Sequence, residues 1–167
     1  MIDRHVPVWL RATLFIAVVP ASVAGWIPWY VAGSPAPAPR AGAPLAILAA
    51  MMVVAGWTVL LICAREFARA GRGTPAPYDP PRSLVSTGLY RFTRNPMYVG
   101  VATAIFGQAL WFHSRDTMIY GIATVMTFHI VILIYEEPRL TKVFGEQYLD
   151  YKKSVPRWIG PIRHDLG

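Results

Sequence analysis

Residues 97–135 read MYVGVATAIFGQALWFHSRDTMIYGIATVMTFHIVILIY, two apolar stretches divided by a short polar turn. The stretches cover about 97–112 and 117–135, and only residues 113–116 separate them. A connection this short predicts an antiparallel hairpin of two helices. The start of the first helix and the end of the second are then expected at the same face of the fold.

Two further apolar stretches, at about 9–31 and 43–64, precede the hairpin. The chain of 167 residues is 54% hydrophobic and 15% charged, whereas a soluble domain carries roughly a quarter charged residues. A helix needs roughly 20 residues to cross a bilayer, a length that 43–64 and 117–135 reach and 97–112 does not. We therefore expect an all-α, polytopic membrane protein with about four transmembrane helices, forming a single membrane-embedded domain over 1–167. A signal peptide at 12–25 is the less favoured alternative, because the apolar run continues to Val31.

The basic residues indicate the orientation of these helices. Of sixteen Lys and Arg, only Arg40 and Arg115 fall in the first and third connections. By the positive-inside rule, both termini and the central loop are cytoplasmic, and the chain is expected in a bacterial inner membrane. The net charge of +7 then indicates contact with anionic lipid headgroups, and not nucleic-acid binding.

The hairpin is expected over 96–137, with one polar segment before it and another after it. Residues 65–95 predict a long cytoplasmic loop, and a loop of this length is usually functional or disordered. Residues 138–160 predict a cytoplasmic amphipathic helix and an interfacial tail, lying against the membrane or over the central loop. The apolar positions of that helix recur mostly at spacings of three and four: Leu140, Val143, Phe144, Tyr148 and Tyr151.

Polar residues gather at the start of the hairpin. Asn95 and Pro96 are typical of a helix N-terminus, so the pair is explained by helix initiation alone. Arg94 and Tyr98 flank the pair and are harder to explain in that way. A helix N-terminus also attracts anions, so the two explanations are compatible.

Glu136 and Glu137 stand at the expected end of the hairpin, where two carboxylates oppose the helix dipole. Adjacent helical residues point about 100° apart, so we expect one glutamate to face a ligand. Its neighbour would pair with a loop arginine on the solvent side, at a cost of less than about 1 kcal/mol on removal. Glu136 is the preferred ligand contact, because it lies deeper in the segment. A solvated helix end is the alternative for both.

The hairpin places a helix start rich in hydrogen-bond donors beside a helix end rich in acceptors. Such a site suits a zwitterionic ligand. S-adenosylmethionine fits this description, although other zwitterions fit equally well. Aromatic faces for its sulfonium are available at Phe92, Tyr90, Tyr98 and Tyr135. The single cysteine, Cys63, and the four histidines form no metal-binding pattern, so no metal is expected.

Several short motifs in order resemble a known superfamily. They are Gly88-Leu89-Tyr90-Arg91, then Arg94-Asn95-Pro96-Met97-Tyr98 with Gly100, then Tyr135-Glu136-Glu137-Pro138, then Phe144-Gly145 and Tyr148. The chain resembles, over roughly 71–158, the integral-membrane methyltransferases that include isoprenylcysteine carboxyl methyltransferase and phospholipid N-methyltransferases. The resemblance implies methyl transfer from S-adenosylmethionine to a membrane lipid or small hydrophobic acceptor, through an amine, carboxylate or thiol, at the cytoplasmic face.

The resemblance also implies roles for individual residues. The catalytic candidates are Glu136, Glu137 and Arg94. The cofactor-binding candidates are Gly71, Gly73, Leu89, Tyr90, Arg94, Asn95, Pro96, Tyr98, Gly100, Glu136 and Glu137. Asn95 stands where the isoprenylcysteine branch commonly has His, which favours the phospholipid branch. The alternatives are an NADPH-dependent relative of the sterol reductases, for which Arg-Asp is expected at 136–137, and a non-catalytic lipid-binding membrane protein.

Overall fold

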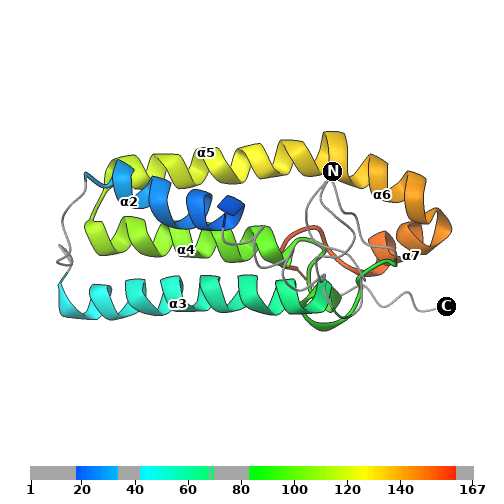
Figure 1. The fold of residues 1–167 in the computed structure, drawn as a ribbon, viewed down its shortest axis with the longest axis horizontal. Coiled ribbons are helices and arrows are strands. Elements are labelled where there is room, and N and C mark those ends of the chain that lie inside the picture. Colours follow the sequence, from blue (N-terminus) through cyan, green and yellow to red (C-terminus); the bar gives the residue numbers. More distant parts are fainter. Residues whose placement is uncertain (1–17, 34–41, 68, 70–82, 161–167) are drawn as a thin grey trace, which may run out of the picture. The chain divides into compact units, whose positions relative to one another are not determined.

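The computed structural model describes residues 18–33, 42–67, 69 and 83–160. Every regular element in these ranges is a helix, which confirms the expected all-α class (Figure 1). The elements are the π-helical turn η1 (Ser22–Trp26), α2 (Ile27–Val31), α3 (Ala43–Glu66), the 3₁₀ turn η3 (Gly88–Arg91), α4 (Pro96–Phe112), α5 (Arg115–Val131), the π-helical turn η4 (Ile132–Glu136), α6 (Glu137–Phe144) and α7 (Glu146–Ser154).

These elements fall into two compact units. The first unit comprises Met1–Ile16, Leu61–Pro96 and Val131–Gly167, and the second comprises Ala17–Leu60 and Met97–Ile130. The second unit contains most of the apolar helices. The first contains the polar motifs at 88–96 and 135–138.

The second unit is held together by close helix packing. Its core consists of Ala24, Leu60, Val101, Ala104 and Ile105. The backbones of α3 and α4 approach so closely that a Cβ atom added at Gly56 would lie 2.6 Å from the carbonyl oxygen of Gly100. Membrane helices associate through small residues in this way, because lipid provides no hydrophobic force to drive them together.

Side chains of the hairpin satisfy backbone carbonyls that a proline exposes. Pro28 lacks the N–H that would bond to the carbonyl of Ala24, and Gln108 Nε2 donates to that carbonyl instead. The N–H of Ile27 bonds to Ser22 O in the π-helical turn η1, so it does not serve the carbonyl of Val23. Tyr120 Oη donates to the Val23 carbonyl at 3.0 Å. In a membrane such carbonyls must find partners inside the protein.

A π-helical turn before a second proline, Pro138, explains why one helix is longer than expected. We expected the second helix of the hairpin to end near Tyr135, and this was wrong: a continuous helix covers Arg115–Phe144. The N–H of Glu137 bonds to Ile132 O in η4, and Pro138 follows at the start of α6. A π-helical turn directly before the proline admits its ring without ending the helix.

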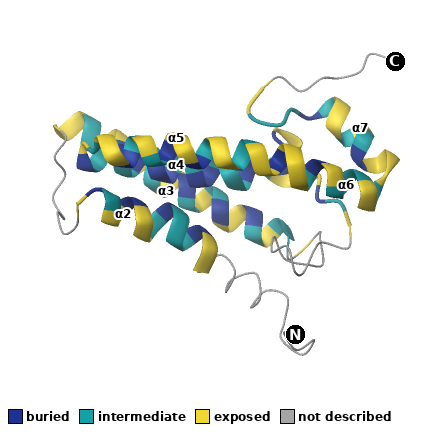
Figure 2. Cartoon of the chain, turned by 90° about the horizontal axis from the view of Figure 1, so that it is seen from above, coloured by how far each residue is buried: buried dark blue, intermediate teal, exposed yellow. Residues whose placement is uncertain are grey.

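Two of the helices have the length and composition of membrane spans. They are Ala43–Glu66 and Arg115–Phe144, while the apolar helices Val18–Val31 and Pro96–Phe112 are shorter. Only 17% and 22% of their most apolar windows are buried inside the protein, which disfavours the core helices of a soluble protein. Exposed positions run along α5 in Figure 2, among them Ile119, Ile122 and Met126. These apolar surfaces are those of a membrane protein.

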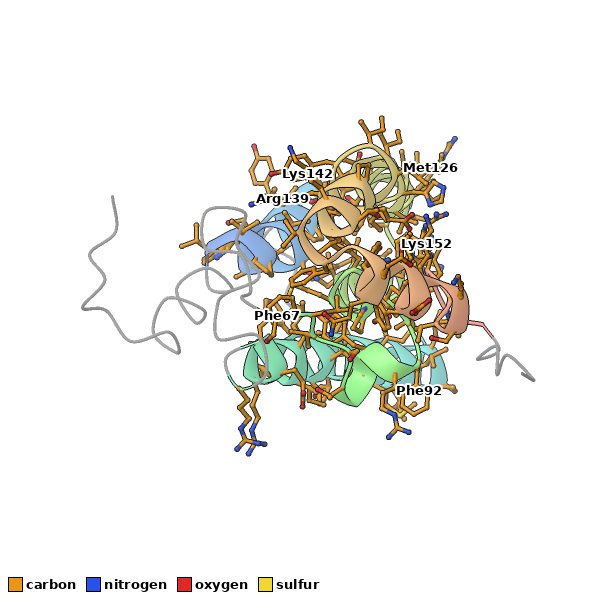
Figure 3. The ribbon with its side chains drawn as sticks, turned by 90° about the vertical axis from the view of Figure 1, so that its right-hand side faces the viewer. Phe67, Phe92, Met126, Arg139, Lys142 and Lys152 are labelled. Carbon is orange, nitrogen blue, oxygen red and sulfur yellow. The ribbon has the colours of Figure 1, made fainter. Side chains whose placement is uncertain are left out.

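In the first unit, α7 packs on the described part of the central loop. The helix α6 ends at Phe144, and its C-cap Gly145, with a φ of +53°, turns the chain into α7. Tyr148 is 2% exposed, and Tyr151 Oη donates to the Tyr90 carbonyl at 2.7 Å. Tyr90 lies in η3 and packs edge-on against Phe67, with ring centroids 5.6 Å apart. Figure 3 views this side of the molecule, with Phe67 and Lys152 labelled.

Candidate functional site

The polar motif that begins α4 is held by a segment close to the C-terminus. This segment, residues 155–157, is called the C-terminal strap below. Its carbonyls accept hydrogen bonds from three consecutive residues: Thr93 Oγ1 donates to Arg157 O at 3.1 Å, the Arg94 N–H to Pro156 O at 2.9 Å, and Asn95 Nδ2 to Arg157 O at 2.9 Å. The side chain of Arg94 also donates through Nε to Val155 O at 3.1 Å.

Glu137 lies at the centre of three cationic side chains. Its Oε1 accepts from Arg94 Nη1 at 2.9 Å and from Arg157 Nε at 2.6 Å. Its Oε2 accepts from Arg157 Nη2 at 3.2 Å and pairs with Lys152 Nζ at 3.0 Å. A carboxylate offers about four acceptor positions. The chain's own donors therefore occupy the acceptor capacity of Glu137.

The burial of these side chains differs across the cluster. The side chains of Glu137 and Arg94 are 7% and 8% exposed, whereas those of Arg157 and Lys152 are 28% and 42% exposed. The Arg94–Glu137 pair therefore forms the buried centre, and Lys152 and Arg157 close it toward solvent. The expected solvent-side location of the arginine-paired glutamate is wrong, because the strap and α7 cover it.

Burial and neighbouring groups shift the pKa values of side chains in this region. The hydrogen bond to Glu137 raises the pKa of Arg157, so its charge is retained. Burial raises the pKa of the Tyr148 phenol, which accepts a hydrogen bond from Arg94 Nη1 at 3.2 Å. Burial likewise raises the pKa of Tyr151. The two tyrosines accordingly remain neutral beside the charged groups.

The structure brings together only part of the expected site. Arg94, Asn95 and Glu137 meet in the first unit, where Pro96 is buried and Glu136 is half-buried. Leu89 and Tyr90 lie in η3 of the same unit. Gly71 and Gly73 fall outside the described residues.

Tyr98 and Gly100 belong to the second unit, where each has a packing role. The ring of Tyr98 stacks at a tilt on Phe128, with centroids 4.3 Å apart. A Cβ atom added at Gly100 would lie 2.9 Å from the carbonyl oxygen of Gly56. The close approach of the backbones is sufficient reason for glycine at this position.

Three residues of the cluster were not among the expected site residues. Tyr148 was expected in an amphipathic helix and is part of a motif that carries the resemblance, and Lys152 and Arg157 fall in the segment expected to form that helix and the interfacial tail. No local pattern in the sequence distinguishes Lys152 from Lys153, although the former pairs with Glu137 and the latter with Asp150. Only the fold determines which of them reaches the buried carboxylate.

The arrangement has a defined chemical character. Arg94, Lys152 and Arg157 together exceed the charge of Glu137, so the cluster attracts anionic groups. Glu136 adds a second carboxylate next in the chain, which suits an ammonium or sulfonium group. Within the described ranges, no group of three His, Cys, Asp or Glu side chains is placed to hold a metal ion.

Comparison with known proteins identifies a family for this chain. A model of the family described as "Phospholipid methyltransferase" matches residues 44–147, which is more than half of the chain. The mouse protein-S-isoprenylcysteine O-methyltransferase is 37% identical over 82 residues, 48% of this chain and 29% of the mouse protein. The methanethiol S-methyltransferase of Pseudomonas deceptionensis is 33% identical over 82 residues, 47% of this chain and 29% of that protein.

A third relative acts on a different substrate class. The phosphatidylethanolamine N-methyltransferase of Eremothecium gossypii is 31% identical over 85 residues, 48% of this chain and 10% of that protein. The chain spans less than a third of the length of each of these three relatives. Their names cover methyl transfer to oxygen, to sulfur and to nitrogen.

Proposed function

The chain belongs to the phospholipid methyltransferase family, and from this premise we propose that it transfers a methyl group from S-adenosylmethionine to a lipidic or small hydrophobic acceptor. The observation that carries the proposal is the convergence of Arg94, Asn95 and Glu137 beside Glu136. These residues come from two of the motifs on which the resemblance to membrane methyltransferases rests. Arg94 and Glu137 lie 43 residues apart in sequence, and their side chains meet at 2.9 Å.

The chemistry of the donor set fits the proposed cofactor. S-adenosylmethionine has a carboxylate, an ammonium and a sulfonium, and when bound it supplies the electrophilic methyl group. The cationic excess around Glu137 suits the carboxylate, and Glu136 suits one of the positive groups. Glu137 has its acceptor positions filled by Arg94, Arg157 and Lys152, so Glu136 is the carboxylate proposed to meet the ligand. The role of the chain is to orient the reactants and to exclude water.

The membrane placement follows from the apolar helices and the charge distribution. We propose four spans with both termini at the cytoplasmic face of a bacterial inner membrane, the shorter helices Val18–Val31 and Pro96–Phe112 completing the set. The polar motifs would then face the cytoplasm and be accessible to a soluble cofactor. The acceptor would enter from the lipid phase.

The acceptor class is proposed at the level that the relatives support. Their substrates by name are an isoprenylcysteine, methanethiol and phosphatidylethanolamine. A carboxylate or thiolate acceptor attacks without a base, whereas an ammonium must first lose a proton. Glu136 is the candidate to take that proton, because Glu137 is held by three cations.

Cofactor binding is the direct test. Protein purified in detergent should bind S-adenosylhomocysteine at one molecule per chain in isothermal titration calorimetry. Saturable binding of NADPH in its place would indicate a reductase, and binding of neither would indicate a non-catalytic protein. Both results would contradict the proposal.

Identifying the acceptor requires the membrane. Membranes that contain the protein should incorporate radiolabel from methyl-labelled S-adenosylmethionine into a lipid-soluble product, and membranes without it should not. Mass spectrometry of the labelled product would show whether the methyl group is on nitrogen, oxygen or sulfur.

A further inference from the structure

We propose that Arg157 is a positioning residue, through which the C-terminal strap holds Arg94 and Asn95 in the geometry that binds the cofactor. The proposal rests on the proposed function for the identity of that ligand. The strap lies in the segment that was expected to be an interfacial tail, and it thereby takes a role in ligand binding.

Arg157 links the two groups that accept hydrogen bonds from the Arg94 side chain. Arg94 donates to Glu137 Oε1 on α6 and to Val155 O in the strap. Arg157 belongs to the strap by its backbone and binds Glu137 through Nε and Nη2, at 2.6 and 3.2 Å. It therefore sets the separation of the two acceptors between which the Arg94 guanidinium lies.

Arg157 also holds Asn95, through its backbone carbonyl. The carbonyl of Arg157 accepts from Asn95 Nδ2 at 2.9 Å and from Thr93 Oγ1 at 3.1 Å. The side chain of Arg157 binds Glu137 on α6, and this contact fixes the position of the Arg157 carbonyl, which orients Asn95. Asn95 Nδ2 uses one of its two N–H groups as the donor in this hydrogen bond.

The shape of the Arg157 guanidinium distinguishes it from the ammonium of Lys152. Arginine presents its donors as a planar fork that matches both oxygens of a carboxylate, whereas lysine presents a single mobile ammonium. Lys152 already supplies an ammonium to Glu137 Oε2, so charge alone does not explain a second cation from the strap. The fork supplies orientation, and orientation is what a positioning residue contributes.

The experiment compares binding with stability in the full chain. Arg157→Ala should weaken S-adenosylhomocysteine binding by about tenfold, measured by calorimetry at a temperature where every variant is folded. Arg157→Lys should recover part of this loss, because it retains the charge without the fork. Lys153→Ala is the matched control, since Lys153 is 62% exposed and pairs with the exposed Asp150, and it should bind as the wild type does.

A double-mutant cycle separates positioning from general destabilisation. If Arg157 acts through Glu137, then Arg157→Ala added to Glu137→Gln should weaken binding by less than about twofold further. Additive losses, or a wild-type affinity for folded Arg157→Ala, would overturn the proposal. If Arg157→Ala does not fold, Arg157→Lys in the same cycle decides the question by the same criterion. Failure of the wild-type protein to bind S-adenosylhomocysteine would instead contradict the proposed function.

Discussion

Arg94 Nη1 donates a hydrogen bond to Glu137 Oε1 at 2.9 Å, and both side chains are almost completely buried. A buried ion pair contributes little net stability when it forms, because both charges lose their hydration. Removal of one partner is costly, since the other charge then remains buried without compensation. Glu137 is a severe case, because Arg157 and Lys152 share its carboxylate.

Glu137→Gln should therefore lower the free energy of unfolding by about 3 kcal/mol. The amide cannot balance the buried Arg94 charge, and its N–H₂ group faces donors. Thermal unfolding in detergent, or chemical unfolding where it is reversible, measures the loss. Asp150→Asn is the control, because its pair with Lys153 is exposed and worth less than about 1 kcal/mol. Equal effects of the two substitutions would contradict the buried-pair description.

Glu136→Gln should affect binding more than stability. We expect a smaller loss of stability than for Glu137→Gln, and a loss of about 1.5–3 kcal/mol in S-adenosylhomocysteine binding, roughly ten- to a hundred-fold in affinity. The reason is that a charge-assisted hydrogen bond to the ligand is removed while the buried cluster stays intact. Titration calorimetry of both glutamine variants provides the measurement. If neither substitution weakens binding, both carboxylates are structural and the cofactor assignment falls.

Gly100→Ala should destabilise the second unit by about 1–3 kcal/mol through overpacking. The added Cβ would lie 2.9 Å from the carbonyl oxygen of Gly56, and backbone cannot move aside cheaply. Gly25→Ala is the matched control in the same unit, because its Cβ would make an ordinary contact of 3.5 Å with Trp57. The control should be neutral or slightly stabilising, since alanine favours helix over glycine. A stable Gly100→Ala protein that fails to bind S-adenosylhomocysteine would assign Gly100 to the ligand and not to packing.

Stability should decrease at alkaline pH, in part because of Tyr151. Burial raises the pKa of its phenol above the ordinary value of 10.0, so the folded chain keeps a proton that the unfolded chain releases. The stabilisation is complete below about pH 10 and decreases above it, by about 1.4 kcal/mol per pH unit for one group. Tyr151→Phe should show a shallower decrease between pH 9 and 11 in thermal unfolding, from a baseline lowered by about 1 kcal/mol for the lost bond to the Tyr90 carbonyl. Parallel curves for the two proteins would contradict the assignment.

Cysteine labelling tests the proposed topology. Single cysteines at positions 40 and 115 should react with an impermeant maleimide from outside the inner membrane, because they lie in the two connections expected at the outer face. A cysteine at Asp150, on an exposed position of α7, should react only after the membrane is permeabilised. Native Cys63 is buried and gives little background. Cytoplasmic labelling at position 40 or 115 would overturn the four-span arrangement.

The sequence by itself determined the helical class, the membrane character and the family. These properties depend on apolar length, residue composition and short motifs, all of which are local along the chain. The boundaries of α3 and α4 follow from the same information. The end of the hairpin does not, because the π-helical turn at Ile132–Glu136 lets the helix pass through Pro138.

Only the tertiary structure decided which charges meet. Glu137 pairs with Arg94, 43 residues earlier, and with Arg157, 20 residues later. Both arginines lie outside the helix that carries Glu137, so no periodicity within one element predicts these pairs. Lys152 and Lys153 are equivalent in sequence, and the orientation of α7 alone brings Lys152 to the carboxylate. The physical reason is that ion pairs depend on distance in space and on burial. Both are set when the C-terminal strap folds back over the start of α4.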